Sequence, residues 1–291
     1  MIARNGRLKI AVQKGGRLTA ESLGLLRACG LSFDPDAQAL HTPCRNFDLD
    51  LLAVRDDDIP EYVQDGVADL GIVGENIVIE SRADVRTLAP LGFGRCRLMI
   101  CVPEQSAMAS IADLVGKRIA TSYPSTLDDF LKREGIDAQI VTLSGAVELA
   151  PTLDVADAIC DLVSTGSTAR INGLRLMQTV LESQSVLVAC PGSLECESKR
   201  KLVDRLMIRV QGSLAARGKR YLMLNAPKSS VESLASIIPS MTSPTVVPLA
   251  DSDMVAVHTV VAEEVFWEVM ERLRDAGARD IVVTPIETII R

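Results

Sequence analysis

The chain has 291 residues and a formal net charge of −7 at pH 7. This acidic balance argues against a nucleic-acid partner, because binding to a phosphate backbone requires a basic surface. Hydrophobic residues make up 47% of the chain, but no apolar run approaches the roughly 20 residues needed to cross a bilayer. Because no signal-peptide core precedes the first predicted strand, we expect a cytoplasmic protein with no membrane contact.

The chain contains seven cysteines and two histidines. An odd number of cysteines with no C-x-x-C pair favours reduced, buried thiols over a disulfide framework or a zinc site. The histidines, His41 and His258, are too few for most histidine-based catalytic arrangements. Any catalysis is therefore expected to depend on placement and electrostatics rather than on an imidazole proton relay.

Short β-branched runs alternate with amphipathic helices through the first two-thirds of the chain, which is the pattern of parallel α/β layers. Strands are predicted at residues 8–12, 49–54, 70–73, 97–102, 118–121, 138–143, 158–163 and 185–189. Helices are predicted from Thr19 to Gly30, from Pro60 to Gly66 and over residues 125–134. Threonine and proline favour a helix start, and glycine favours a helix end.

These elements form two α/β lobes joined by strands near Val102 and Val188. The predicted boundaries are residues 1–103 with 189–217 for lobe I, and residues 104–188 for lobe II. Such an arrangement leaves a cleft between the lobes, where the carboxyl ends of the strands and the loops that follow them meet. The cleft is the expected place for a ligand.

The last part of the chain has a different pattern. A charged helix over residues 195–216 precedes elements in the order β-α-β-β-α-β, at residues 221–225, 231–238, 245–249, 254–261, 263–276 and 281–285. This is the order of the split βαβ unit of ferredoxin-like domains. Residues 218–291 are therefore predicted to form a separate domain.

The most informative segment covers residues 157–173. A buried strand carries Asp157 and Asp161, and a helix start follows a loop of small residues, namely Ser164, Thr165, Gly166, Ser167 and Thr168. Backbone N–H groups and hydroxyls in such a loop bind a phosphate without a side-chain cation. The two carboxylates suit sugar hydroxyls or a metal ion. The segment predicts a sugar-phosphate site, and the alternative is an ordinary helix cap.

Cations at the ends of two strands indicate a polyphosphate ligand. Lys14 and Arg17 flank a pair of glycines directly after the first strand, where the backbone can approach a ligand closely. The alternative is that both are ordinary surface residues. Arg55 follows the second strand and is placed to face the cleft, whereas the three aspartates after it are expected mainly to cap the next helix.

Other polar residues stand at predicted strand ends or helix starts in both lobes: Glu75, Ser122, Tyr123 and Glu148. They line the same cleft if the lobes face each other, or they only cap helices and meet solvent. Their positions alone do not separate these two interpretations.

Several motifs in a fixed order make the chain resemble the ATP phosphoribosyltransferases in their long form. They are QKGGRL at residues 13–18, RDDDIP at 55–60, DLGIVGEN at 69–76, KRIATSYP at 117–124, ADAICDLVSTGST at 156–168 and SPT at 243–245. The resemblance covers nearly the whole chain. It implies an α/β fold with two lobes like those of a type II periplasmic binding protein, followed by an ACT-like, ferredoxin-type regulatory domain.

The resemblance also implies an activity. The family transfers the 5-phosphoribosyl group from 5-phosphoribosyl 1-diphosphate to N1 of ATP, releases pyrophosphate and so begins histidine biosynthesis. Magnesium as the cofactor, inhibition by L-histidine, and homodimers that assemble into a homohexamer are implied as well. Because adenine N1 has a free lone pair, no base has to remove a proton before attack, which agrees with the few histidines.

Residue roles follow from the resemblance in the same way. The loop at residues 164–168 holds the 5-phosphate, and Asp157 and Asp161 hold the ribose hydroxyls directly or through magnesium. The cations that face pyrophosphate or the ATP phosphates are Lys14, Arg17, Arg55 and Arg97. Of these, Arg55 is assigned to the leaving group and joins the two aspartates as catalytic. The same site is completed by Glu75, Ser122, Tyr123 and Glu148, and the effector histidine is assigned to Asn225 and Thr245.

Two other classes of protein share parts of this pattern. A prephenate dehydratase also joins such a catalytic region to an ACT domain, but its carboxylate substrate gives no reason for a phosphate loop. A solute-binding protein or a transcription regulator shares the lobes. These would carry a signal peptide or a basic helix-turn-helix, and the sequence shows neither.

Overall fold

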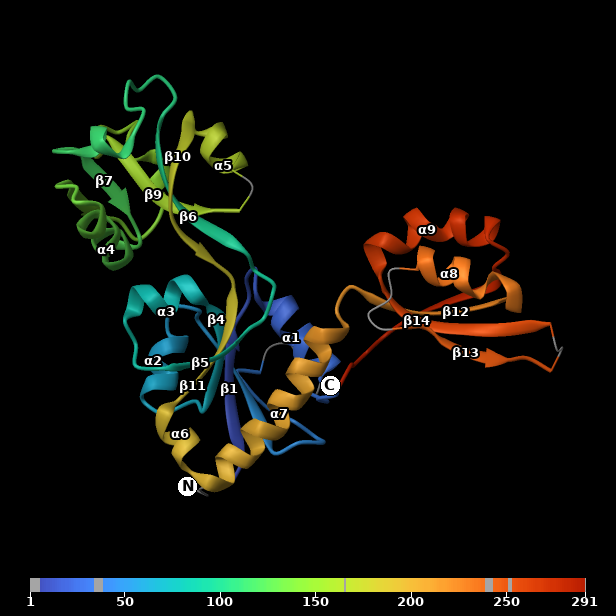
Figure 1. Ribbon diagram of the computed structural model, residues 1–291. Helices are drawn as coiled ribbons and strands as arrows, with labels where there is room; N and C mark the ends of the chain where they lie inside the picture. The colour runs from blue at the N-terminus through green and yellow to red at the C-terminus, as the bar shows by residue number, and fades with distance from the viewer. Residues whose placement is uncertain (1–5, 34–38, 165, 239–242, 251–252, 291) are drawn as a thin grey trace. The chain divides into compact units, whose positions relative to one another are not determined.

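The computed structural model describes residues 6–33, 39–164, 166–238, 243–250 and 253–290 (Figure 1). The chain divides into two compact units. Unit 1 contains residues 1–27 and 31–204, and unit 2 contains residues 28–30 and 205–291. Helix α7 (Glu197–Ala216) contributes residues to both units.

Lobe I of unit 1 is built on a six-stranded sheet in the order β2-β3-β1-β4-β11-β5. Its strands are β1 (Leu8–Gln13), β2 (His41–Pro43), β3 (Leu49–Val54), β4 (Leu70–Gly74), β5 (Arg86–Pro90) and β11 (Ser185–Ala189). Its helices are α1 (Thr19–Ala28), α2 (Ile59–Gln64), α3 (Glu75–Ser81) and α6 (Pro191–Glu195). Strands β3, β1 and β4 are parallel, so their carboxyl ends share one edge of the sheet.

The strands of this sheet are apolar, and helices that pack closely against them bury the sheet. A parallel sheet needs helices on both faces, and here α2 and α3 cover one face while α1 lies on the other (Figure 1). Helix α2 packs closely because β4 has glycine at position 71. A Cβ on Gly71 would lie 2.7 Å from Ile59 Cγ2 and 2.9 Å from Val63 Cγ2. On the α1 side, Leu25 and Leu26 are buried.

Lobe II has a five-stranded sheet in the order β10-β6-β9-β7-β8. Its strands are β6 (Cys96–Pro103), β7 (Arg118–Thr121), β8 (Gln139–Thr142), β9 (Ala158–Val163) and β10 (Leu174–Ser183). Its helices are α4 (Pro124–Glu134) and α5 (Ser167–Ile171), with short 3₁₀ turns η1 (Ile111–Leu114) and η2 (Val147–Leu149). Strands β7, β8 and β9 are parallel, and β6 is antiparallel to β9 and β10.

The structure moves both predicted lobe boundaries, which were placed at 103/104 and 188/189. Strand β6 belongs to the second sheet and β11 to the first. The chain therefore crosses into lobe II at residues 91–95 and returns at Gln184. Both strands are apolar runs, and such a run indicates that a strand is buried but not which sheet it joins. Lobe II is thus an insertion of residues 96–183 into lobe I.

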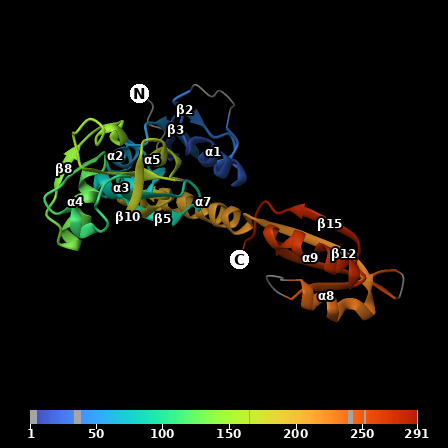
Figure 2. The same ribbon diagram turned by 90° about the horizontal axis from the view of Figure 1, so that it is seen from above.

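Unit 2 contains a four-stranded antiparallel sheet in the order β13-β14-β12-β15. Its elements are β12 (Lys219–Pro227), η3 (Lys228–Ser230), α8 (Val231–Ile237), β13 (Thr245–Pro248), β14 (Met254–Ala262), α9 (Glu263–Asp275) and β15 (Arg279–Pro285). This order along the chain is the predicted β-α-β-β-α-β order of ferredoxin-like domains. Both helices lie on one face of the sheet and cover Leu222 and Leu224 (Figures 1 and 2).

The seven cysteines are free thiols, and all except Cys196 are buried. They add small apolar side chains to a core that is poor in aromatic residues. Among the helices in the described parts of the chain, none is long and apolar enough to cross a membrane.

Candidate active site

The carboxyl ends of the parallel strands in both lobes lie next to the crossings between the lobes. Strand β11 begins beside the end of β4, where Ser185 pairs with Gly74. In lobe II, Arg97 near the start of β6 pairs with Val163 at the end of β9. The loops that follow β1, β3 and β4 in lobe I, and β7 and β9 in lobe II, therefore lie at the cleft edges of their sheets.

The loop after β9 closes a small cavity of about 90 Å³, which we call the cradle. Its polar lining consists of Glu148, Asp161, Ser164, Gly166, Ser167 and Thr168. Gly166 has a φ of +78°, a left-handed conformation that glycine adopts without strain, and it leads the chain into α5. A cavity of this size has room for a few water molecules or one small tetrahedral anion. Thr165, also predicted here, lies outside the described residues.

Asp161 is a half-buried carboxyl group in the lining of the cradle. Burial raises its pKa, the backbone N–H of Leu162 lowers it through a 2.7 Å hydrogen bond to Oδ1, and the Glu148 carboxylate raises it again. Two like charges beside a small cavity favour a bound cation or the hydroxyls of a sugar. Among the described residues no group of three or more histidine, cysteine or carboxylate ligands gathers at one point. A magnesium ion here would thus need substrate oxygens as well.

Asp157 lies at the start of β9, away from the cradle. Its Oδ2 accepts a 2.8 Å hydrogen bond from the backbone N–H of Arg118, and its Oδ1 lies 3.2 Å from Arg118 Nη2. These contacts hold the pKa of its carboxyl below the usual value. About 20 Å of extended chain separates it from Ser164. Asp157 is therefore not in the lining of the cradle, and its predicted role toward ribose or magnesium gains no support from this position.

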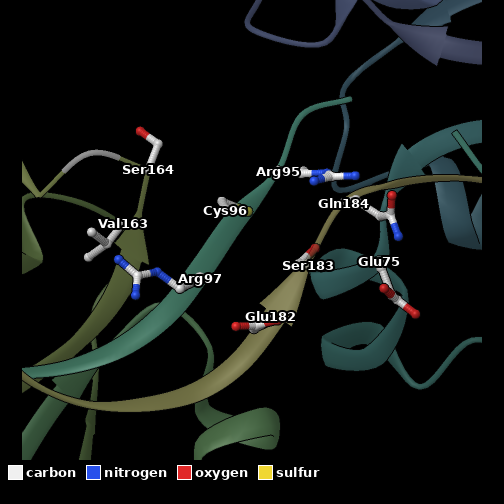
Figure 3. Close-up of a pocket in the computed structure, with 9 residues that line it drawn as sticks. All are labelled: Glu75, Arg95, Cys96, Arg97, Val163, Ser164, Glu182, Ser183 and Gln184. Atoms are coloured by element: carbon white, nitrogen blue, oxygen red, sulfur yellow. The ribbon is translucent and has the colours of Figure 1, made fainter. Parts of the chain in front are cut away.

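A larger cavity of about 380 Å³ lies at the crossings, and we call it the crossover cavity (Figure 3). Its lining consists of Glu75, Arg95, Cys96, Arg97, Val163, Ser164, Glu182, Ser183 and Gln184. Val163 and Ser164 also line the cradle, so the two cavities adjoin. In Figure 3, the Arg97 guanidinium extends toward Val163 and that of Arg95 toward Gln184. Arg95 and Arg97 therefore provide a cation on each side of the chain where it enters strand β6.

Cations are concentrated at the cleft edges of the sheets in this acidic protein. Lys14 and Arg17 follow β1, Arg55 follows β3, and Arg95 and Arg97 stand at the crossing, all with exposed side chains. Within the described part of the chain, none of these five side chains has an ion-pair partner. Guanidinium and ammonium groups left free in this way are suited to phosphate oxygens.

Ser122 and Tyr123, which follow β7, both have partners within the protein. Ser122 Oγ donates a 2.7 Å hydrogen bond to the carbonyl of Leu143. Tyr123 Oη accepts a 3.2 Å hydrogen bond from the Asn76 amide of lobe I. Burial raises the pKa of Tyr123 well above its usual value, so its hydroxyl stays neutral. These two predicted site residues therefore hold the local structure, and neither lines the two cavities described above.

Sequence reasoning missed Arg95, Glu182 and Gln184 of the crossover cavity. Arg95 lies directly before β6 and outside the strand, so the alternation of side chains along a strand gave no signal for it. Glu182 and Gln184 gave no signal either, since strand β10 was not recognised and its end could not be placed beside β6.

In unit 2, a cavity of about 380 Å³ opens on the sheet. Its lining consists of Tyr221, Ser243, Thr245, Val247, His258, Thr259 and Val260. Tyr221 Oη lies 2.8 Å from His258 Nδ1, within hydrogen-bonding distance. Of the two residues predicted to hold an effector, Thr245 lines this cavity. The other, Asn225, is not in the lining, and its amide donates a 3.1 Å hydrogen bond to Asp280 Oδ2.

The fold and the cavities define a two-lobed α/β protein with two adjoining cavities and free cations at the cleft edges of its sheets. Residues 55–212 match the family model for ATP phosphoribosyltransferase, and residues 216–288 match the model for the HisG C-terminal domain. An ATP phosphoribosyltransferase from Cytophaga hutchinsonii is 45% identical over 284 residues, which is 98% of this chain and 99% of that protein. The chain belongs to the ATP phosphoribosyltransferase family, as its motifs predict.

A solved structure has a related fold. It is the ATP phosphoribosyl transferase (HisG:HisZ) complex from Thermotoga maritima, with 25% identity, a TM-score of 0.59, and coverage of 70% of this chain and 98% of the matched chain. The predicted fold class and activity are confirmed. The enzyme transfers the 5-phosphoribosyl group to N1 of ATP in the first step of histidine biosynthesis, and inhibition by histidine is typical of its family.

Proposed function

We propose that the two adjoining cavities form the active site, with the 5-phosphate of 5-phosphoribosyl 1-diphosphate in the cradle and its diphosphate in the crossover cavity. The observation that carries this proposal is that Val163 and Ser164 line both cavities. This substrate has one phosphate at one end of its ribose and two at the other, so it needs adjoining anion sites of unequal size. Loop N–H groups and hydroxyls suit the smaller site, and guanidinium groups suit the larger one.

Asp161 and Glu148 are proposed to hold the ribose hydroxyls and a magnesium ion. Carboxylate oxygens combined with substrate phosphate oxygens are the usual ligands of Mg²⁺ in proteins. When bound, magnesium neutralises charge on the departing pyrophosphate. Asp157 is left out of the proposed site, because Arg118 holds its carboxylate at the other end of β9.

The protein's own residues contribute placement and charge to the transfer. Adenine N1 attacks C1 of the ribose while the bond from C1 to the diphosphate oxygen breaks. We assign Arg55 and Arg97 to the charge that develops on the leaving group, and holding both substrates in line lowers the barrier further. Neither histidine takes part, since His41 contacts Asp50 and His258 lies in unit 2.

Turnover of the full chain with ATP, 5-phosphoribosyl 1-diphosphate and magnesium tests the proposal, followed by the ultraviolet absorbance of N1-substituted adenine. We expect Asp161→Asn and Arg55→Ala each to lower kcat about 100-fold, and removal of magnesium by a chelator to stop turnover. Asp157→Asn is the matched control, because it removes the same charge from the same segment but outside both cavities. It should keep most of the turnover.

Two results would contradict these assignments. If Arg55→Ala turns over normally at saturating substrates, Arg55 does not serve the leaving group. If Asp161→Asn and Asp157→Asn have equal effects on turnover, the cradle is not the phosphoribosyl site.

For regulation and assembly, we propose that L-histidine binds the cavity of unit 2 and that the chain forms homodimers that assemble into a homohexamer. Tyr221, Thr245 and His258 offer hydrogen-bonding groups of the kind that a small amino acid needs. Val247 and Val282 are exposed apolar residues on the sheet of this unit that a second copy could cover. We also propose a cytoplasmic location, where ATP is abundant and buried thiols stay reduced.

A further inference from the structure

A carboxylate of lobe I binds the first turn of a helix in lobe II. Both oxygens of Glu80, on α3, accept hydrogen bonds from the start of α4. The backbone N–H groups of Ser125 and Thr126 donate at 2.9 Å, and Thr126 Oγ1 donates at 2.7 Å. Thr126 is buried and Glu80 is half-buried, so solvent competes only weakly for these bonds. We call this contact the α3–α4 clasp.

Helix α4 depends on this contact for its N-terminal cap. The first N–H groups of a helix have no partner within the helix and need an acceptor from elsewhere. Tyr123 occupies the cap position and makes no side-chain cap hydrogen bond, and Pro124 follows it at the first helical position. Glu80 therefore supplies from the other lobe both the acceptors and the negative charge that a helix start favours.

Lobe I holds the clasp close to the crossing between the lobes. Asn76, in the first turn of α3, donates its backbone N–H to Ser183 Oγ at 3.0 Å, and its side-chain oxygen accepts a 2.9 Å hydrogen bond from the same hydroxyl. Ser183 is the last residue of β10, directly before the return to lobe I. The Asn76 amide also contacts Tyr123 Oη. Helix α3 is thus fixed to the crossing at one end and to α4 at the other.

We propose that Glu80 is a positioning residue for the phosphoribosyl transfer. Two extended crossings alone leave two lobes free to hinge, and the clasp adds a separate attachment between them. It sets the angle at which the cradle of lobe II faces the lobe I cations such as Arg55. A misplacement of about 1 Å can cost about 100-fold in rate, so this angle acts on the chemical step. The inference rests on the proposed active site between the lobes.

Three measurements on the full chain test this role in Glu80→Ala: kcat, calorimetric binding of 5-phosphoribosyl 1-diphosphate, and hydrogen exchange of α4. We expect kcat to fall about 10- to 100-fold and the amides of Ser125 and Thr126 to exchange faster. Binding should keep the wild-type stoichiometry, because the cradle that receives the 5-phosphate lies within lobe II. A purely structural role would instead lower stoichiometry and kcat together, and that result would overturn the proposal.

Arg82→Ala is the matched control. Arg82 Nη2 lies 2.9 Å from Asp129 Oδ1 and also joins α3 to α4, but these side chains are 59% and 61% exposed. Exposed ion pairs contribute little, so this variant should keep kcat within about twofold of wild type. An equal loss in Arg82→Ala and Glu80→Ala would mean that any contact between the helices has the same effect, and Glu80 would have no special role.

Two milder variants keep the proposal testable if Glu80→Ala does not fold. Glu80→Gln leaves one acceptor oxygen in place of two, and Thr126→Val removes only the hydroxyl donor. Both should give a kcat between those of the wild type and Glu80→Ala. If both match the wild type, the clasp does not position the lobes. Failure of the proposed active site is a separate result, because Asp161→Asn would then also turn over normally.

Discussion

Asp157 and Asp161 belong to one segment, yet their surroundings differ. Asp161 lines the cradle with Glu148, whereas Asp157 is bound by Arg118. Their even spacing predicts that both side chains lie on one face of the strand. However, a strand rises about 3.3 Å per residue, so roughly 13 Å separates them. The sequence could therefore predict the type of site and the face of the strand, but not which carboxylate reaches the ligand.

The two carboxyls should have opposite effects on stability. Burial and Glu148 raise the folded-state pKa of Asp161 above its usual value of 3.8. Ionisation of Asp161 therefore destabilises the fold as the pH rises from the unfolded-state pKa through the raised folded-state pKa. Arg118 lowers the pKa of Asp157, so its contribution is present at neutral pH and is lost as the pH falls through the lowered pKa. We expect Asp161→Asn to raise Tm near pH 7 and Asp157→Asn to lower it.

Thermal unfolding of both variants from neutral to acid pH measures this difference. Both shifts in Tm should become smaller as the pH falls, because protonation makes each wild-type carboxyl neutral like its amide replacement. Shifts of the same sign near pH 7 would contradict the two environments described here.

Among the elements, clean apolar runs were predicted well and irregular strands were missed. Strands β1, β3, β4 and β9 have buried, β-branched or leucine-rich sequences, and each was predicted close to its observed bounds. Strand β10 was missed because most of its residues are half-buried and its pairing with β6 has two register shifts. Such a strand shows neither alternation nor a continuous apolar run. The edge strand β5 is mostly exposed, so its sequence likewise shows no apolar pattern that predicts a strand.

The turn at each end of α5 provides a test at the level of an element. Gly166 and Gly173 have φ values of +78° and +66°, so alanine at either position strains the backbone by about 1–2 kcal/mol. A Cβ at Gly166 would also lie 3.3 Å from Leu176 Cδ1, whereas at Gly173 nothing lies within 4 Å. We expect Gly166→Ala to raise the KM for 5-phosphoribosyl 1-diphosphate about tenfold, equivalent to 1.4 kcal/mol, because it distorts the cradle.

Steady-state kinetics with varied 5-phosphoribosyl 1-diphosphate check this expectation, with Gly173→Ala as the matched control for backbone strain. The control should keep a KM near that of the wild type. A similar KM increase in both variants would show that strain in α5, and not the shape of the cradle, controls binding.

For the whole molecule, the division into units separates the proposed catalytic and effector sites. The single tryptophan, Trp267, lies on α9 of unit 2 and is 72% exposed. If L-histidine binds unit 2, its addition should change the fluorescence of Trp267, whereas ATP or 5-phosphoribosyl 1-diphosphate alone should not. Fluorescence titrations with each ligand measure this response. A free tryptophan derivative, titrated in the same way, corrects for the light that ATP absorbs. A response to ATP alone would indicate that a substrate binds at unit 2, and it would contradict the assignment of the catalytic site to unit 1.

The insertion of lobe II has a consequence for how the chain acquires its fold during synthesis. Strand β5 lies at the sheet edge, and the neighbour that connects it to β4 is β11, which follows about 100 residues later. When β5 leaves the ribosome, its partner has not yet been made. Contacts between distant parts of a chain form late. Lobe II can therefore close while lobe I still has an open edge, and lobe I is completed only when β11 arrives between β4 and β5.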